Sequence, residues 1–220
     1  MREDIDLVAR RAIETGEVTL RSGWQKMMAL AGEDTYGKTE APLKGRVSIL
    51  SVNWSEHFIR AALKESAQYS DTEDIRDNLL TSIDALPILS NELADMDSKW
   101  GSTGKLMEPS RPRIRTSYDK LTHLKRDSEF LNVYVGDSPT DFDALLAADV
   151  GICICDDPMG SSQKSLADTL ARVGCEVIHI GRADPHSFSG NTLLWARDFD
   201  EIHDFLLAMQ RLNPKTSTVE

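Results

Sequence analysis

The sequence lacks long apolar runs and has few cysteines, and both features exclude classes of protein. Its three cysteines, Cys153, Cys155 and Cys175, match neither a zinc-binding spacing nor a Cys-x-x-Cys redox motif. Two of them lie in an apolar segment, which indicates buried free thiols in a reducing compartment. No apolar stretch approaches the roughly 18 residues of a membrane span, and the acidic start is unlike a signal peptide. We therefore expect a cytoplasmic protein that has no membrane partner.

Basic residues are also scarce relative to acidic ones. The chain has 25 Lys and Arg against 36 Asp and Glu, which gives a net charge of −11 and an isoelectric point near 4.9. Such a surface argues against nucleic acid or an anionic membrane as the main partner. Any site for a phosphorylated molecule must therefore be locally positive. Apolar residues make up 40% of the chain, enough for a buried core with or without a smaller appendage.

The most informative segment is residues 131–154, which has the pattern of a strand, a turn, a helix and a second strand. An apolar run at 133–135 ends at Gly136, apolar residues at helical spacing follow, and 150–155 is apolar again. This order is typical of a parallel sheet, whose sites lie beyond the carboxyl ends of its strands. Asp137 follows directly after the first strand, where such a site is expected.

The turn after Gly136 allows two interpretations. Ser138, Pro139 and Asp141 fit a helix-capping box, with serine as the cap, proline at the first helical position and an acid three residues after the cap. That interpretation leaves Asp137 unexplained. In the alternative, Asp137 and Asp141 together hold a hard cation such as Mg²⁺, which prefers oxygen ligands. The residues of the turn do not decide between the two.

A second strand end with polar residues comes earlier in the chain. We predict a strand at 47–52, followed by a turn in which Ser55 caps a helix that begins at Glu56. This capping role leaves Ser51 and Asn53 to direct a hydroxyl and an amide out of the carboxyl end of the strand. Further helices are predicted at residues 3–15, 23–31, 70–83, 118–125, 161–173 and 199–212, and further strands at 86–93, 176–180 and 192–196.

Lys120 falls in the first turn of the helix predicted at 118–125. A cation is disfavoured there because the amino end of a helix carries partial positive charge. The ordinary interpretation is a solvated surface lysine. The alternative is a lysine that reaches a phosphate.

The motifs Ser51, Lys120 and Gly136-Asp137-Ser138-Pro139-Thr140-Asp141, in this order, resemble the second, third and fourth motifs of the haloacid dehalogenase-like (HAD) hydrolase superfamily. The likeness is closest to its phosphoserine-phosphatase-like branch, and to fungal members that carry Ser-Val-Asn-Trp-Ser. It extends over about residues 47–206.

The resemblance implies a Mg²⁺-dependent phosphomonoesterase in which an aspartate attacks the phosphoryl group. Ser51 is expected to donate a hydrogen bond to the phosphoryl oxygens, and Lys120 to neutralise their charge. Asp137 is expected to bind Mg²⁺, with Asp141 as a further ligand or as a support behind the ligands. Asn53 and Ser138 are expected to contact or orient the phosphate. The implied partner is a small phosphorylated molecule.

One part of the family pattern is missing. Its first motif, an apolar strand that ends in Asp-x-Asp-x-Thr, should precede Ser51. The Asp-x-Asp pairs of this chain lack that context, and they begin at Asp4, Asp95, Asp141 and Asp198. We therefore expect the chain to start within the family's helical cap and to be inactive or nearly so, because the nucleophile and the general acid are absent.

The missing strand is the central one of the family's sheet, between the serine strand and the Gly-Asp strand. Its loss leaves buried backbone N–H and C=O groups unpaired, and each unpaired group lowers the free energy of unfolding by about 1–3 kcal/mol. Several such losses are comparable to the total stability of a domain, about 5–15 kcal/mol. Three outcomes are open: a fragment of a longer phosphatase, a substitute segment in the gap, or an open and marginal core. The oligomeric state is open as well.

These observations predict an α/β fold, a Rossmann-like parallel sheet with helices on both faces that lacks its central first strand. Residues 1–45 are expected to be a partial helical cap, 46–212 the core and 213–220 a disordered tail. The alternative function is a non-catalytic phosphate-binding or regulatory module. A nucleotide-binding domain is disfavoured, because 160–165 lacks the glycine before lysine that a P-loop requires, and no Gly-x-Gly-x-x-Gly occurs.

Overall fold

The computed structural model describes residues 2–30, 45–96, 98–99, 101–107, 113–124, 131–184 and 192–212. The chain forms two compact units, Met1–Ile114 (unit 1) and Arg115–Glu220 (unit 2). The predicted tail at 213–220 lies outside the described residues, as does Asp97 of one Asp-x-Asp pair.

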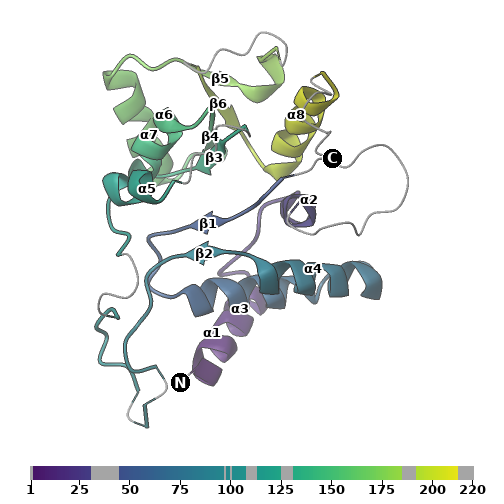
Figure 1. Cartoon of the computed structure of the whole chain (residues 1–220), viewed down its shortest axis with the longest axis vertical. Helices are drawn as coiled ribbons and strands as arrows, with labels where there is room; N and C mark the ends of the chain where they lie inside the picture. The colour runs from purple at the N-terminus through teal and green to yellow at the C-terminus, as the bar shows by residue number, and fades with distance from the viewer. Residues whose placement is uncertain are drawn as a thin grey trace, which may run out of the picture. The chain divides into compact units, whose positions relative to one another are not determined.

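Unit 1 is mainly helical, with one short pair of parallel strands (Figure 1). Its elements are α1 (Arg2–Glu14), α2 (Trp24–Ala29), β1 (Ile49–Leu50), α3 (Glu56–Ala67), α4 (Glu73–Ala85) and β2 (Ile88–Leu89). Helix α3 packs between α1 and α4, and α2 contacts α4. Strands β1 and β2 pair in register, Ile49 with Ile88 and Leu50 with Leu89.

Both strands of unit 1 are shorter than the apolar runs that predict them. The backbone N–H of Ser51 still donates to the carbonyl of Leu89 at 2.9 Å, and the chain then turns toward α3. Ser55 caps that helix as predicted, because its hydroxyl accepts the N–H of Phe58 at 3.1 Å. In the turn, the N–H groups of Asn53 and Ser55 donate to the side chains of Ser51 and Asn53 rather than to a neighbouring strand.

Unit 2 contains a four-stranded parallel sheet in the order β3-β4-β6-β5. Its elements are α5 (Ser117–His123), β3 (Val133–Gly136), the 3₁₀ turn η1 (Pro139–Asp141), α6 (Phe142–Ala147), β4 (Val150–Ile154), α7 (Ser161–Arg172), β5 (Val177–His179), the 3₁₀ turn η2 (Ile180–Arg182), β6 (Leu193–Ala196) and α8 (Phe199–Leu212). All of β4 is buried. In Figure 1, α6 and α7 lie to one side of the strands and α8 to the other.

These features confirm the predicted fold class at the level of an α/β protein, about half helical, with parallel sheets flanked by helices. The strand, turn, helix and strand predicted within 131–154 are present as β3, η1, α6 and β4. The predicted end of the helix near Gly174 is also confirmed. Gly174 has φ of +75°, and its N–H donates to the carbonyl of Ala171 at 3.1 Å, as in a left-handed helix cap.

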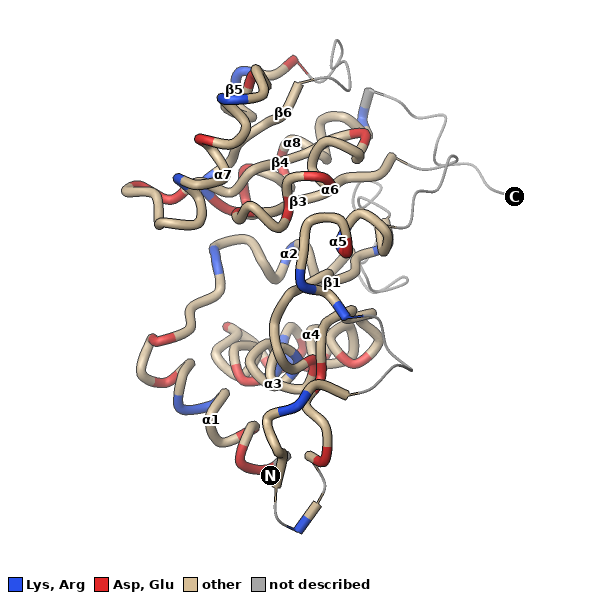
Figure 2. Tube along the Cα trace, turned by 90° about the vertical axis from the view of Figure 1, so that its left-hand side faces the viewer, with Lys and Arg blue, Asp and Glu red and all other residues tan. Residues whose placement is uncertain are grey.

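Strands β1 and β3 each have a strand neighbour on one side only within the described residues, β2 and β4 respectively. Figure 2 shows acidic residues in both units, interspersed with basic ones. Of the helices in the described part of the chain, none is both long enough and apolar enough to cross a membrane.

Candidate site at the carboxyl end of strand β3

Lys120 and Asp141 meet in the interior of unit 2. The ammonium Nζ of Lys120 lies 2.5 Å from Oδ1 of Asp141, and the two residues are 5% and 4% exposed. Lys120 is placed by α5, whose first turn is capped by the Thr116 hydroxyl, which accepts the N–H of Asp119 at 3.1 Å. The interpretation of Lys120 as a solvated surface lysine is therefore wrong.

The carboxylate of Asp141 accepts hydrogen bonds at both of its oxygens. Besides Lys120, Oδ1 accepts the hydroxyl of Tyr134 at 2.7 Å. The other oxygen, Oδ2, accepts the N–H groups of Asp137 and Ser138 at 3.2 and 3.0 Å, and the Ser138 hydroxyl at 2.8 Å. The contact from the Ser138 N–H is the acidic half of the predicted capping box. Asp141 thus holds the turn after β3 closed.

The positive charge of Lys120 keeps the Asp141 carboxyl ionised. Burial would raise the pKa of Asp141, but the Lys120 ammonium and hydrogen bonds from Lys120, Tyr134 and Ser138 outweigh it and hold this pKa below its usual range. Burial, together with the negative charge of Asp141, raises the pKa of Tyr134 well above its usual range. Asp141 is therefore ionised at neutral pH. The Tyr134 hydroxyl stays protonated and donates a hydrogen bond to the Asp141 carboxylate.

Gly136 is required at the end of β3 because the Asp141 side chain lies against its backbone. A β-carbon at this position would overlap the carboxylate carbon of Asp141 and would lie 2.9 Å from Oδ2. This close approach gives the glycine of the Gly-Asp motif a structural reason that does not depend on a ligand.

The described residues supply few ligands for Mg²⁺, an ion that proteins often hold through one or two carboxylates together with waters and phosphate. Asp137 is half-buried directly after β3, where the sequence predicts a ligand. Both oxygens of Asp141 already accept hydrogen bonds, so a direct ligand role would cost one of these contacts. Within the described residues, no group of three or more His, Cys, Asp or Glu side chains lies close enough to hold a metal ion. Asp137 is the one predicted ligand whose position suits the role.

Ser51 and Asn53 belong to unit 1, where their side chains shape the turn between β1 and α3. The Ser51 hydroxyl accepts the N–H of Asn53 at 3.1 Å, and the Asn53 amide oxygen accepts the N–H of Ser55 at 3.0 Å. Both side chains are half-buried. These contacts fix the carboxyl end of β1, and they use a lone pair on each of the two oxygens.

Sequence reasoning missed two residues that organise these turns. Tyr134 supplies one of the donors to Asp141, and its place in an apolar strand gave no sign of a buried polar contact. Asn91, 6% exposed, donates from its side chain to the carbonyls of Val52, Asn53 and Ile114 and accepts the N–H of Ile114 at 3.0 Å. Its position in Ser90-Asn91-Glu92-Leu93 was the only available signal.

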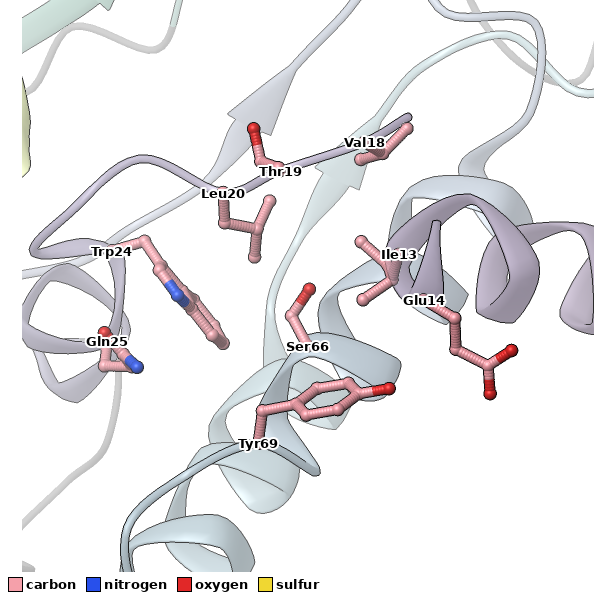
Figure 3. Close-up of a pocket in the computed structure, with 9 residues that line it drawn as sticks. All are labelled: Ile13, Glu14, Val18, Thr19, Leu20, Trp24, Gln25, Ser66 and Tyr69. Carbon is pink, nitrogen blue, oxygen red and sulfur yellow. The ribbon is translucent and has the colours of Figure 1, made fainter. Parts of the chain in front are cut away.

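Unit 1 also contains a cavity of about 340 Å³ between the amino-terminal helices and the end of α3 (Figure 3). Its lining is a mixture of apolar and polar side chains: Ile13, Glu14, Val18, Thr19, Leu20, Trp24, Gln25, Ser66 and Tyr69. In Figure 3 the carboxylate of Glu14 points away from the Trp24 ring. None of the site residues predicted from sequence lines this cavity.

Comparisons of this chain with family models, with curated proteins and with solved structures find no match. The likeness to the HAD superfamily therefore consists of the motifs named above.

Proposed function

We propose that the chain is a HAD-like domain of the phosphatase type that binds a phosphate group at the carboxyl end of β3 but does not itself hydrolyse phosphomonoesters. The observation that carries this proposal is the buried Lys120–Asp141 pair, directly beside the turn that bears Asp137. It joins two separate motifs of the resemblance in one network.

The donors of Lys120 support a phosphate ligand. An ammonium carries three N–H groups, and in the described part of the chain Asp141 is the one acceptor for them. A buried ammonium with unused donors is unfavourable unless another acceptor is supplied. A phosphoryl oxygen supplies such an acceptor, and Asp141 holds the lysine in place for it.

The strand pairing within each unit, taken separately, supports the proposal that the family's first strand is absent. Strands β1 and β3 bear the serine and the Gly-Asp motif, and within the described residues each is paired on one side only. The nucleophilic aspartate of the family belongs to the missing strand. This is the reason for proposing that the chain has no turnover.

In HAD phosphatases Mg²⁺ supplies charge stabilisation at the phosphoryl group. Asp137 is the described residue that would hold the metal, and no step is assigned to it here. The second candidate function is a non-catalytic module for which phosphate binding or regulation is itself the function, rather than an inactive phosphatase that lacks its nucleophile. The specific observation is that both oxygens of Asp141 accept hydrogen bonds from protein donors.

The proposal includes a cytoplasmic location, supported by the three cysteines, which are free thiols. Its ligand is a small phosphorylated molecule. The Lys120 site is tested by titrating the ¹⁵N-labelled chain with inorganic phosphate and following the backbone amide signals by NMR. Saturable shifts of Gly136, Asp137 and Ser138 are expected, with sodium chloride at equal ionic strength as the control. Phosphate binding that leaves these three amides unchanged would contradict the proposal.

A further inference from the structure

A second cavity in unit 2 runs along β5 and reaches the carboxyl ends of β5 and β6, where parallel sheets commonly bind ligands. It has a volume of about 580 Å³, and its lining consists of Val177, Ile178, His179, Arg182, Trp195 and Arg197. It contains none of the residues on which the proposed function rests. An inference about this cavity can therefore be tested independently of that function.

The aromatic wall of the cavity is held in place from several sides. Strand register pairs His179 with Trp195, and the two rings meet edge to face with centroids 4.3 Å apart. The Nδ1 atom of His179 accepts the N–H of Gly181 at 3.1 Å, and Nε2 lies 3.3 Å from Oε2 of Glu201. The same Glu201 oxygen accepts the backbone N–H of Arg197 at 2.9 Å. The wall is therefore formed before any ligand binds.

The charge of the cavity is opposite to that of the chain. Arg182 and Arg197 are exposed, and within the described residues neither guanidinium has an ion pair or a hydrogen bond. Two nearby carboxylates already accept from other groups: Glu201 contacts His179 and the Arg197 N–H, and Asp198 accepts the N–H of Glu201 at 3.0 Å. Two arginines without an acidic partner are notable in a chain of net charge −11. Guanidinium groups bind phosphate through paired, charge-assisted hydrogen bonds.

We propose that this cavity binds a flat aromatic molecule that carries a phosphate group. The phosphate lies between Arg182 and Arg197, and the ring packs against the indole of Trp195. A cavity of this size falls in the range of small-molecule sites, about 300–1,000 Å³, with a few polar groups that fix the orientation of the ligand. Planar aromatic contacts and the two guanidinium groups together favour such a ligand over inorganic phosphate alone.

The test is a titration of the full chain with phenyl phosphate, followed by calorimetry and by amide NMR. The double variant Arg182→Gln/Arg197→Gln is expected to weaken binding at least about tenfold, which corresponds to about 1.4 kcal/mol. Arg172→Gln, which removes a charge from the exposed end of α7, is the matched control and is expected to leave the affinity within about twofold. Trp195→Leu is expected to weaken phenyl phosphate more than inorganic phosphate.

The NMR arm requires no substitution and so is independent of whether the variants fold. Binding at this cavity shifts the amides of Gly181 and Arg197, whereas binding at the Lys120 site shifts those of Asp137 and Ser138. The proposal is overturned if phenyl phosphate shows no saturable binding up to about 10 mM, a concentration that detects even millimolar affinity. It is equally overturned if phenyl phosphate shifts the Gly181 amide of the folded double variant at the same concentrations as in the native chain, or if inorganic phosphate saturates the Gly181 shift at the same concentration as phenyl phosphate.

Discussion

The Nζ atom of Lys120 and the Oδ1 atom of Asp141 lie 2.5 Å apart, and both side chains are almost wholly buried. Each charge has lost most of its contact with water, a cost that is offset only while the partner is present. Lys120 is on a helix and Asp141 in a 3₁₀ turn, so their pairing ties α5 to the turn that follows β3.

Replacing Asp141 by Asn is expected to lower the free energy of unfolding by about 3–5 kcal/mol, because it leaves the Lys120 ammonium buried without its counter-charge. Lys120→Met is expected to cost less, because Tyr134 and Ser138 continue to donate to the carboxylate. Urea denaturation followed by circular dichroism measures both.

The double variant Lys120→Met/Asp141→Asn is the control for this pair. We expect its loss of stability to be smaller than the sum of the two single losses, since neither buried charge is then left alone. Additive losses would mean that the two side chains do not interact in solution.

The stability of the chain should depend on pH through Asp141. The pKa of this carboxyl is lowered in the folded state, so its contribution is complete above the unfolded value near 3.8. That contribution is lost as the pH falls below 3.8 toward the folded value. Urea midpoints measured from pH 6 down to pH 3 at constant ionic strength should show the gap between native chain and Asp141→Asn shrinking with acid. A gap of constant size would contradict the assigned protonation.

Gly136→Ala should destabilise the chain, because the new β-carbon would overlap the Asp141 side chain and displace it from its donors. The expected loss is about 1–3 kcal/mol, as for other overpacked positions. The control is Gly160→Ala, where a β-carbon meets no atom within 4 Å and the change should stay within about 1 kcal/mol. Equal effects of the two substitutions would show that the close approach at Gly136 is not important. Thermal unfolding is a sufficient measurement.

Cys153 should resist alkylation in the folded chain. Burial, with smaller contributions from the charges of Cys155 and Asp141, raises the pKa of its thiol to about 12, and the thiolate is the reactive form. Iodoacetamide at pH 8, followed by mass spectrometry of tryptic peptides, should label Cys153 only after urea is added. Labelling at the same rate with and without urea would contradict the buried position of β4.

The parts of the fold that follow from local pattern could be predicted from the sequence. The unit formed by β3, η1, α6 and β4 has its strand, turn and helix signals within a single stretch at 131–154. The cap at Ser55 and the helix end near Gly174 are also local, and both are present. Strand β1 was predicted too long because an apolar run at 47–52 does not show where pairing with β2 stops.

The candidate site depended on contacts between distant residues, which the sequence does not display. Lys120 and Asp141 are 21 positions apart, and the burial of Lys120 requires the packing of α5 against η1 and α6. The same reason accounts for Tyr134 and Asn91, whose polar partners lie in other elements. Pairing of β6 with both β4 and β5 likewise follows from tertiary packing and creates the cavity at Trp195.

We propose that this chain binds phosphate at a phosphatase-type site without turnover. Hydrolysis of 4-nitrophenyl phosphate with Mg²⁺ tests it most directly, with the native chain and Asp137→Asn purified in parallel. The account predicts no release of nitrophenol above background from either protein, with circular dichroism showing that both are folded. Activity of the native chain that disappears in Asp137→Asn would contradict it, because a carboxylate of this chain would then replace the missing nucleophile.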